Sequence, residues 1–143
     1  MGWFFFYAGI TKVLNPAWSA AQSLAGAETF RGLFAWFALP ENIGWVSALN
    51  AWGLTLLGAS LILGLGVRFS SVLGAVLMGL YYFMKLKFPY PTPYTYLVDD
   101  HIIYALALLS LAALRAGRVW GLETWCANLS ICKKYPRLHA FWG

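Results

Sequence analysis

Three ionisable residues in a row open the last long apolar segment of this chain: Asp99, Asp100 and His101. Tyr104 follows Asp100 after one helical turn. A carboxylate, an imidazole and a phenol within one turn can hydrogen-bond in sequence and pass a proton, and histidine titrates in the useful range. Two interpretations stay open: Asp100, His101 and Tyr104 handle protons or a ligand, or an acid serves only as a helix N-cap that accepts backbone amides.

Four basic residues occupy positions in the sequence from which their charges could lie near this cluster. Lys12 closes the first apolar segment, Arg31 lies in the following loop, and Lys85 and Lys87 end the third segment. Lys12 has two interpretations. Its stem could extend to lipid headgroups, or its ammonium group could pair with one of the two acids, because an ionisable group inside a membrane bundle is costly and often functional.

The amino-acid composition indicates the class of protein to which these residues belong. Of the 143 residues, 61% are hydrophobic and only 10% are charged, and the mean hydropathy is +0.66. Soluble domains carry about 25% charged residues, so this composition indicates an integral membrane protein. The net charge of +5 then reflects how lysine and arginine are distributed between loops, and nucleic acid is not an expected partner.

Four apolar segments predict four spanning helices, since about 20 apolar residues cross a bilayer. The first is short, so either its helix begins at the membrane interface or Met1 is not the native start. We expect an all-α, integral membrane four-helix bundle within residues 1–125, a single domain, followed by a cytoplasmic tail over residues 126–143. The expected helices cover residues 2–14, 43–65, 69–84 and 98–114.

The basic residues predict the orientation. The side that holds both termini carries Arg68, Arg115, Arg118, Lys133, Lys134 and Arg137, whereas the other side carries Lys12, Arg31, Lys85 and Lys87. By the positive-inside rule, both termini lie in the cytoplasm and the acid-histidine cluster faces outward at the cell membrane. Cys126 and Cys132 would then stay reduced, and their spacing matches no familiar metal site.

The loop between the first two helices is expected to be structured. Its large apolar residues recur with helical spacing and predict a short interfacial helix; they are Phe30, Leu33, Phe34 and Phe37. Ser19 and Gln22 have capping-box spacing, which indicates another short helix before Gly26. A proline-rich and tyrosine-rich stretch over residues 85–96 is either a stiff connector or, with this loop, the wall of a pocket.

Small residues predict how the helices pack. Ser71, Ala75 and Gly79 stand four residues apart, and glycines recur in the preceding helix. In lipid, such residues allow two helices to approach closely, so the second and third helices are expected to form an antiparallel hairpin. Asn50 lies inside the second helix and must find a partner.

Several of these motifs together resemble the DoxX/DoxD family of small four-helix membrane proteins, and the closest branch looks like DoxD, the membrane subunit of thiosulfate:quinone oxidoreductase. The resemblance implies that thiosulfate is oxidised to tetrathionate at the outer face and that a membrane quinone accepts the electrons. It assigns Gly9, Arg68, Gly117, Arg118, Gly121 and Glu123 to the structural motif. The motifs are Gly9-x-x-Lys12, Gly66-Val67-Arg68, Asp100-His101 and Gly117-Arg118-x-x-Gly121-Leu122-Glu123.

This resemblance yields the first functional hypothesis. Lys12, Arg31, Lys85 and Lys87 would hold the sulfur oxyanion, and Asp100, His101 and Tyr104 would exchange the protons of the quinone. The sequence contains no haem motif and no metal site, so electrons would pass directly to quinone or through a partner subunit. The alternative is a non-catalytic membrane subunit that assembles or scaffolds a larger complex. Lipid binding or transport is a weaker third hypothesis, because no helix is interrupted in its middle.

Overall fold

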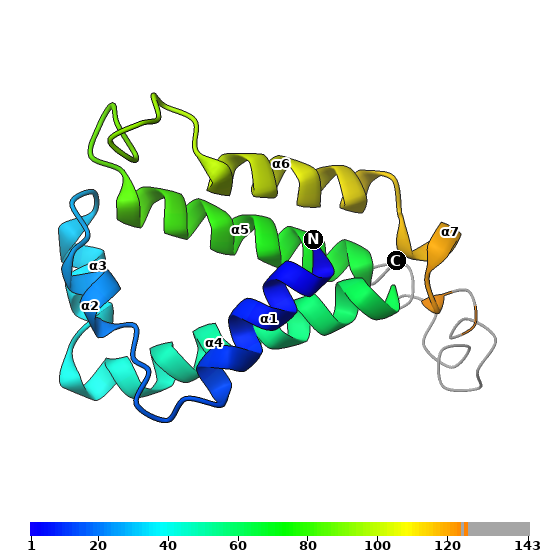
Figure 1. Cartoon of the computed structure of the whole chain (residues 1–143), viewed down its shortest axis with the longest axis horizontal. Helices are drawn as coiled ribbons and strands as arrows, with labels where there is room; N and C mark the ends of the chain where they lie inside the picture. Colours follow the sequence, from blue (N-terminus) through cyan, green and yellow to red (C-terminus); the bar gives the residue numbers. More distant parts are fainter. Residues whose placement is uncertain (124, 126–143) are drawn as a thin grey trace.

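The computed structural model describes residues 1–123 and 125, which are mostly helical and contain no strand (Figure 1). The expected tail over residues 126–143, with Cys126 and Cys132, lies outside the described residues. The helices are α1 (Gly2–Val13), α2 (Ala21–Ala25), α3 (Arg31–Phe37), α4 (Pro40–Leu63), α5 (Val67–Lys85), α6 (Asp100–Ala113) and α7 (Gly117–Trp120).

The long helices form two pairs, α1 with α4 and α5 with α6 (Figure 1). The pairs diverge toward one end of the molecule, where α2 and α3 lie, and α7 lies at the opposite end. The expected hairpin of α4 and α5 is present as a connection, yet α4 packs more extensively against α1 than against α5. The reason is that Gly58 of α4 and Gly9 of α1 let these two helices approach closely.

Close approach of α1 and α4 depends on two glycines. A Cβ atom added to Gly9 would lie 2.3 Å from the backbone nitrogen of Thr55, and one added to Gly58 would lie 2.1 Å from the backbone nitrogen of Phe6. Since no side chain fits at either point, the two backbones are in direct contact. Gly9 is therefore a contact residue between α1 and α4.

On α5 the expected row of small residues is displaced. Ser71 is fully buried, and a Cβ atom on Gly74 would meet the side chains of Leu57 and Leu108. Gly79, in contrast, has no atom within 4 Å of that position. The buried row therefore runs from Ser71 to Gly74 and Met78, because the contact face follows the helical repeat of 3.6 residues and not a strict step of four.

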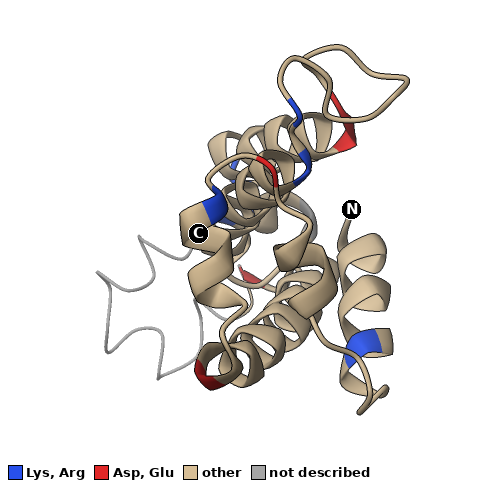
Figure 2. Cartoon of the chain, turned by 90° about the vertical axis from the view of Figure 1, so that its left-hand side faces the viewer, with Lys and Arg blue, Asp and Glu red and all other residues tan. Residues whose placement is uncertain are grey.

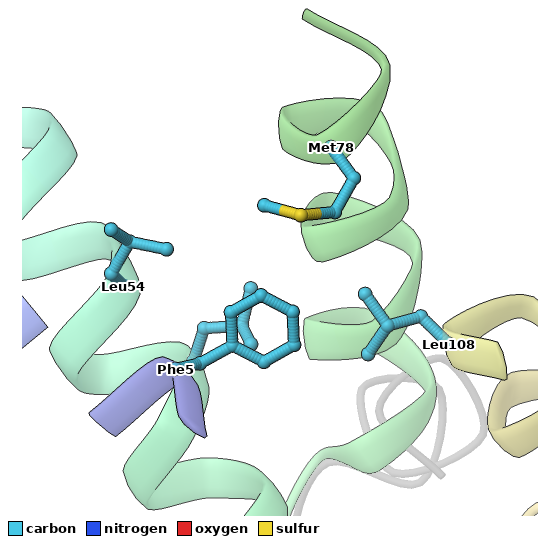
Figure 3. Packing of buried hydrophobic residues seen from close by; sticks show 5 residues of the cluster. Phe5, Leu54, Met78 and Leu108 are labelled. Carbon is cyan, nitrogen blue, oxygen red and sulfur yellow. The ribbon is translucent and has the colours of Figure 1, made fainter. Parts of the chain in front are cut away.

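One core joins the two helix pairs (Figure 3). Phe5 of α1, Leu54 and Leu57 of α4, Met78 of α5 and Leu108 of α6 form a single buried cluster, and Phe5 and Leu108 have no exposed surface. Each of the four long helices contributes to this cluster. The described residues thus form one helical bundle around a shared apolar centre.

Two helices are long and apolar enough to cross a membrane: α4 with 24 residues and α5 with 19. Only 28% and 22% of their most apolar windows are buried inside the protein, so most of this apolar surface faces outward. Figure 2 shows that most of the ribbon carries no charged residue. By length, α1 with 12 residues and α6 with 14 are shorter than a span, because a turn ends α1 after Val13 and the N-cap Asp99 delays the start of α6.

The short interfacial helix predicted around Phe34 is confirmed as a helix, α3, but its face differs from the expected one. Phe34 is 4% exposed, whereas Phe30 is 59% exposed. Phe30 has a left-handed backbone conformation with a φ of 52°, which takes its side chain out of the helical register. Pro40 begins α4, since proline suits the first position of a helix, where no amide donor is needed.

The motif Gly117-Arg118-x-x-Gly121-Leu122-Glu123, which follows α6, packs against the turn between α4 and α5. A Cβ atom on Gly121 would lie 2.3 Å from the carbonyl oxygen of Gly64, and the amide of Leu122 donates to the carbonyl of Leu63 at 3.1 Å. Glu123 is 4% exposed, and its carboxylate lies 3.6 Å from Nε of Arg118. Gly117 leaves room for this carboxylate, because a Cβ atom there would lie 2.4 Å from it. The motif therefore fastens the chain after α6 to the α4–α5 turn, near the exposed Arg68 at the start of α5.

Candidate functional site

Polar side chains from the four long helices form one connected network. Nζ of Lys12 on α1 donates to Oδ1 of Asn50 on α4 at 3.2 Å, and Nδ2 of Asn50 donates to the hydroxyl of Tyr81 on α5. The Tyr81 ring meets the imidazole of His101 on α6 nearly edge-on, with ring centroids 5.9 Å apart. Asn50, expected to need a partner, has two, and through them it links α1 to α5.

Asp99 extends the network and also starts α6. Its carboxylate is 4% exposed and accepts the backbone amides of His101 and Ile102, at 3.0 and 3.3 Å. Its second oxygen lies 2.6 Å from Nδ1 of His101. Because an ionised carboxylate only accepts hydrogen bonds, Nδ1 carries the hydrogen in this contact, and in the neutral ring Nε2 is left as the acceptor. Asp99 is thus the helix N-cap that one of the two interpretations expected, and it also contacts His101.

The network lines a pocket of about 230 Å³ beneath α2. Lys12, Asn50, Tyr81, Lys85 and His101 all contribute to its wall. The Lys12 ammonium also lies 4.9 Å from the centre of the Trp18 ring, within the range of a cation–π contact. The Lys12 ammonium, together with an amide, a phenol, an imidazole and a second lysine in the lining, makes this pocket suited to a small anion that also accepts hydrogen bonds.

The structure brings together only some of the residues expected to act together. Lys12, Lys85 and His101 share the pocket, whereas Arg31 and Lys87 are exposed and each lies beside Glu28, at 3.4 and 3.6 Å. Lys12 bonds neither acid of the cluster, since Asn50 intervenes.

The expected series of Asp100, His101 and Tyr104 is likewise divided. Asp100 is exposed, and it is Asp99 that contacts His101. The Tyr104 ring packs against Phe4, at 4.9 Å between centroids, and borders the apolar core. The reason is geometric: the side chain of the N-cap Asp99 folds back over the first turn of its helix, while Tyr104, five positions further along, lies on the packing face.

Sequence reasoning did not identify Tyr81 and Trp18 as site residues. Tyr81 sits in an apolar helix and Trp18 in a loop, and nothing in their spacing relates them to Lys12. The available signal was Asn50: an amide within an apolar helix requires hydrogen-bonding partners, and a tyrosine near the same end of the neighbouring helix is a suitable one.

The segment that carries α2 and α3, residues 14–39, is held over the pocket by Thr29. The Thr29 hydroxyl donates to the carbonyl of Leu86 at 2.6 Å. We expect Thr29→Val to cost about 1 kcal/mol of unfolding free energy and to speed proteolysis within residues 14–39, measured by limited digestion in detergent. Thr11→Val is the matched control, because the Thr11 hydroxyl bonds only within α1. Equal digestion rates for both variants would contradict this role of Thr29.

Comparison of the chain with protein-family models, with curated proteins and with solved structures finds no match. The fold and the site define its class: a mostly helical protein with two helices long and apolar enough to cross a membrane, and a buried polar network at one end of its bundle. Any more specific assignment rests on the sequence motifs and on the chemistry of the pocket.

Proposed function

We propose that this chain is the membrane subunit of an oxidoreductase of the DoxD type, which passes electrons from thiosulfate to a membrane quinone. In this proposal it lies in the cell membrane as a four-helix bundle, with both termini in the cytoplasm and the pocket at the outer face. The observation that supports it is the pocket itself, a space of about 230 Å³ whose lining includes two lysines, Lys12 and Lys85, and His101.

The outward-facing apolar surface of α4 and α5 supports the membrane placement. Leu49, Leu56 and Val76 are each about three-fifths exposed, and in water such a surface would be costly. A helix as short as α1 rises only about 18 Å, so α1 and α6 would cross the apolar layer only in part, with α2 and α3 filling the outer interface beside them.

The chemistry of thiosulfate suits the pocket. The ion carries two negative charges, and Lys12, which is partly buried, and Lys85, which is exposed, would supply matching positive charge. Two thiosulfate ions each lose one electron and join through a new sulfur–sulfur bond to give tetrathionate. The two electrons and two protons convert the quinone to quinol. The two protons are consumed by the quinone, and His101, positioned by Asp99, is the acid–base group that we propose takes up a proton and passes it toward the quinone.

The test is thiosulfate-dependent reduction of a soluble quinone by the protein purified with its native partners. We expect Lys12→Met to raise the KM for thiosulfate about tenfold, the effect of about 1.4 kcal/mol of lost binding. Arg31→Met is the matched control, since Arg31 is an exposed cation beside Glu28 and outside the pocket; its KM should stay within twofold. Equal increases of the KM for thiosulfate in both variants would show that the pocket is not the thiosulfate site.

An intact, quinone-containing preparation without turnover would instead favour the non-catalytic subunit that assembles a larger complex. One observation fits that alternative: Trp3 and Tyr7 of α1 are 68% and 60% exposed and stack against each other. Their rings provide an aromatic surface for a neighbouring subunit.

A further inference from the structure

A second pocket, of about 150 Å³, lies next to the first and shares part of its lining with it, namely Leu24, Val46, Asn50, Tyr81 and Met84. It opens between α3, α4 and α5, and its lining is almost entirely apolar, with Phe34, Trp45, Leu49 and Leu80 among its residues. Asn50 and Tyr81 also line the cationic pocket that contains Lys12. The two side chains therefore form a polar wall shared by a cationic pocket and an apolar groove.

The hydrogen bonds of this wall determine what it can bind. The Lys12 ammonium group can only donate hydrogen bonds, so the Asn50 amide turns its oxygen toward Lys12 and its nitrogen toward Tyr81. The Tyr81 oxygen thus accepts from Asn50, and its hydroxyl hydrogen remains to be donated. Within residues 1–123 and 125, this hydrogen has no recorded acceptor. The wall consequently offers a donor to a ligand, which matches a carbonyl oxygen.

The mouth of the groove lies on the apolar outside of the bundle. Leu49 is 65% exposed, Trp45 47% and Leu80 40%. In the membrane placement of the proposed function, this surface faces lipid. A ligand entering here comes from the bilayer and carries an apolar tail.

We propose that the groove between α3, α4 and α5 binds the head of the membrane quinone, with one ring carbonyl accepting from Tyr81 and the isoprenoid tail leaving past Leu49 and Leu80. This inference rests on the proposed function for the membrane placement, and it adds to it the place and route of the electron acceptor. The sulfur anion and the quinone then occupy different pockets. Electrons cross the lining that the two pockets share, of which Asn50 and Tyr81 are the polar part.

The experiment uses a probe that needs no thiosulfate: a benzoquinone with a decyl tail and a photoreactive azide, added to the purified protein in detergent. Labelled positions are read by peptide mass spectrometry. We expect labelling of α4 and α5 around Leu49 and Leu80, and at least a fivefold loss of it in Leu49→Trp and Leu80→Trp, because the larger ring closes the groove.

Matched controls lie two helical turns away on the same helices. Leu56→Trp and Leu73→Trp place the same ring at residues that are 64% and 50% exposed but do not line the groove, and labelling should be retained. A second probe, in which a benzene ring replaces the quinone, tests the head. Tyr81→Phe should weaken labelling by the quinone probe severalfold and leave labelling by the benzene probe unchanged.

The outcomes separate this inference from the proposed function. Labelling spread evenly over the helices, or equal loss in the groove variants and their controls, would overturn the groove as the quinone site even if thiosulfate turnover is present. If labelling is confined to the groove but the preparation does not oxidise thiosulfate, the groove is supported as the quinone site and thiosulfate is refuted as the substrate. Equal response of both probes to Tyr81→Phe would overturn the assignment of the carbonyl.

Discussion

Replacing Gly58 with alanine is expected to separate α1 from α4 and to destabilise the protein strongly. The new methyl group would lie 2.1 Å from the backbone nitrogen of Phe6 and 2.5 Å from its Cα. A flexible side chain could move aside, but a helix backbone cannot. Overpacking typically costs 1–3 kcal/mol, and a clash with backbone belongs at about 3 kcal/mol, the upper end. The measurement is the unfolding free energy in mild detergent.

Gly53→Ala is the control for this prediction, in the same helix. A Cβ atom on Gly53 meets nothing within 4 Å, and alanine favours a helix over glycine by about 1 kcal/mol. This variant should therefore be as stable as the wild type or slightly more stable. If the two variants unfold alike, the close contact of α1 and α4 is not what holds the bundle together.

The consequence of Gly58→Ala should reach the site. Phe5 and Lys12 are both on α1, and Lys12 meets Asn50 only because α1 lies so close to α4. A shift of α1 by about 1 Å would lengthen that hydrogen bond beyond its effective range. Gly58, which does not line the pocket, thus determines the geometry of the pocket through the contact of α1 with α4.

The helices themselves could be predicted from the sequence, because apolar runs, glycines and prolines are local signals. The segments expected over residues 43–65 and 69–84 correspond to α4 and α5, with each boundary within three residues of the expected one. The short helix around Phe34 was likewise visible in its periodicity. The exposure of Phe30 could not be predicted, because the spacing of apolar residues does not reveal a left-handed backbone conformation at the N-cap.

The pairing of helices could not be predicted in the same way. Gly58 and Gly79 look alike in the sequence, yet one meets the backbone of α1 and the other faces open space. Which glycine is used depends on the rotation of each helix around its axis, and that rotation is fixed by the whole core. The site follows the same rule: Tyr81 joins Asn50 and His101 only after α4, α5 and α6 are packed.

The choice between neighbouring acids shows this limit most clearly. Asp99 and Asp100 have the same side chain, and the motif favours Asp100 as the partner of His101. In the structure Asp100 begins the helix and is exposed, while Asp99 precedes it with an extended backbone and folds its carboxylate onto the first turn. The position of the helix start, one residue earlier or later, decides which acid is buried.

Asp99→Asn is therefore expected to abolish most quinone reduction without unfolding the protein. Asparagine caps a helix about as well as aspartate, so the loss of stability should stay below about 1 kcal/mol. Its amide nitrogen, however, would face Nδ1 of His101, where the carboxylate now accepts a hydrogen at 2.6 Å. To accept from that amide, the ring must move its hydrogen to Nε2, and His101 then offers a donor where it had offered a base. Loss of a correctly placed acid–base group costs about 100-fold or more in rate.

The control is Asp100→Asn, an identical change one residue later at an exposed position, for which the rate should stay within twofold. The tautomer of His101 is read from the nitrogen chemical shifts of its imidazole ring in protein labelled with nitrogen-15, which a purely structural effect of the cap would leave unchanged. If Asp100→Asn lowers the rate as much as Asp99→Asn, or if the tautomer does not change, then Asp99 does not orient His101. The adjacent pair would then act only through its charge at the start of α6.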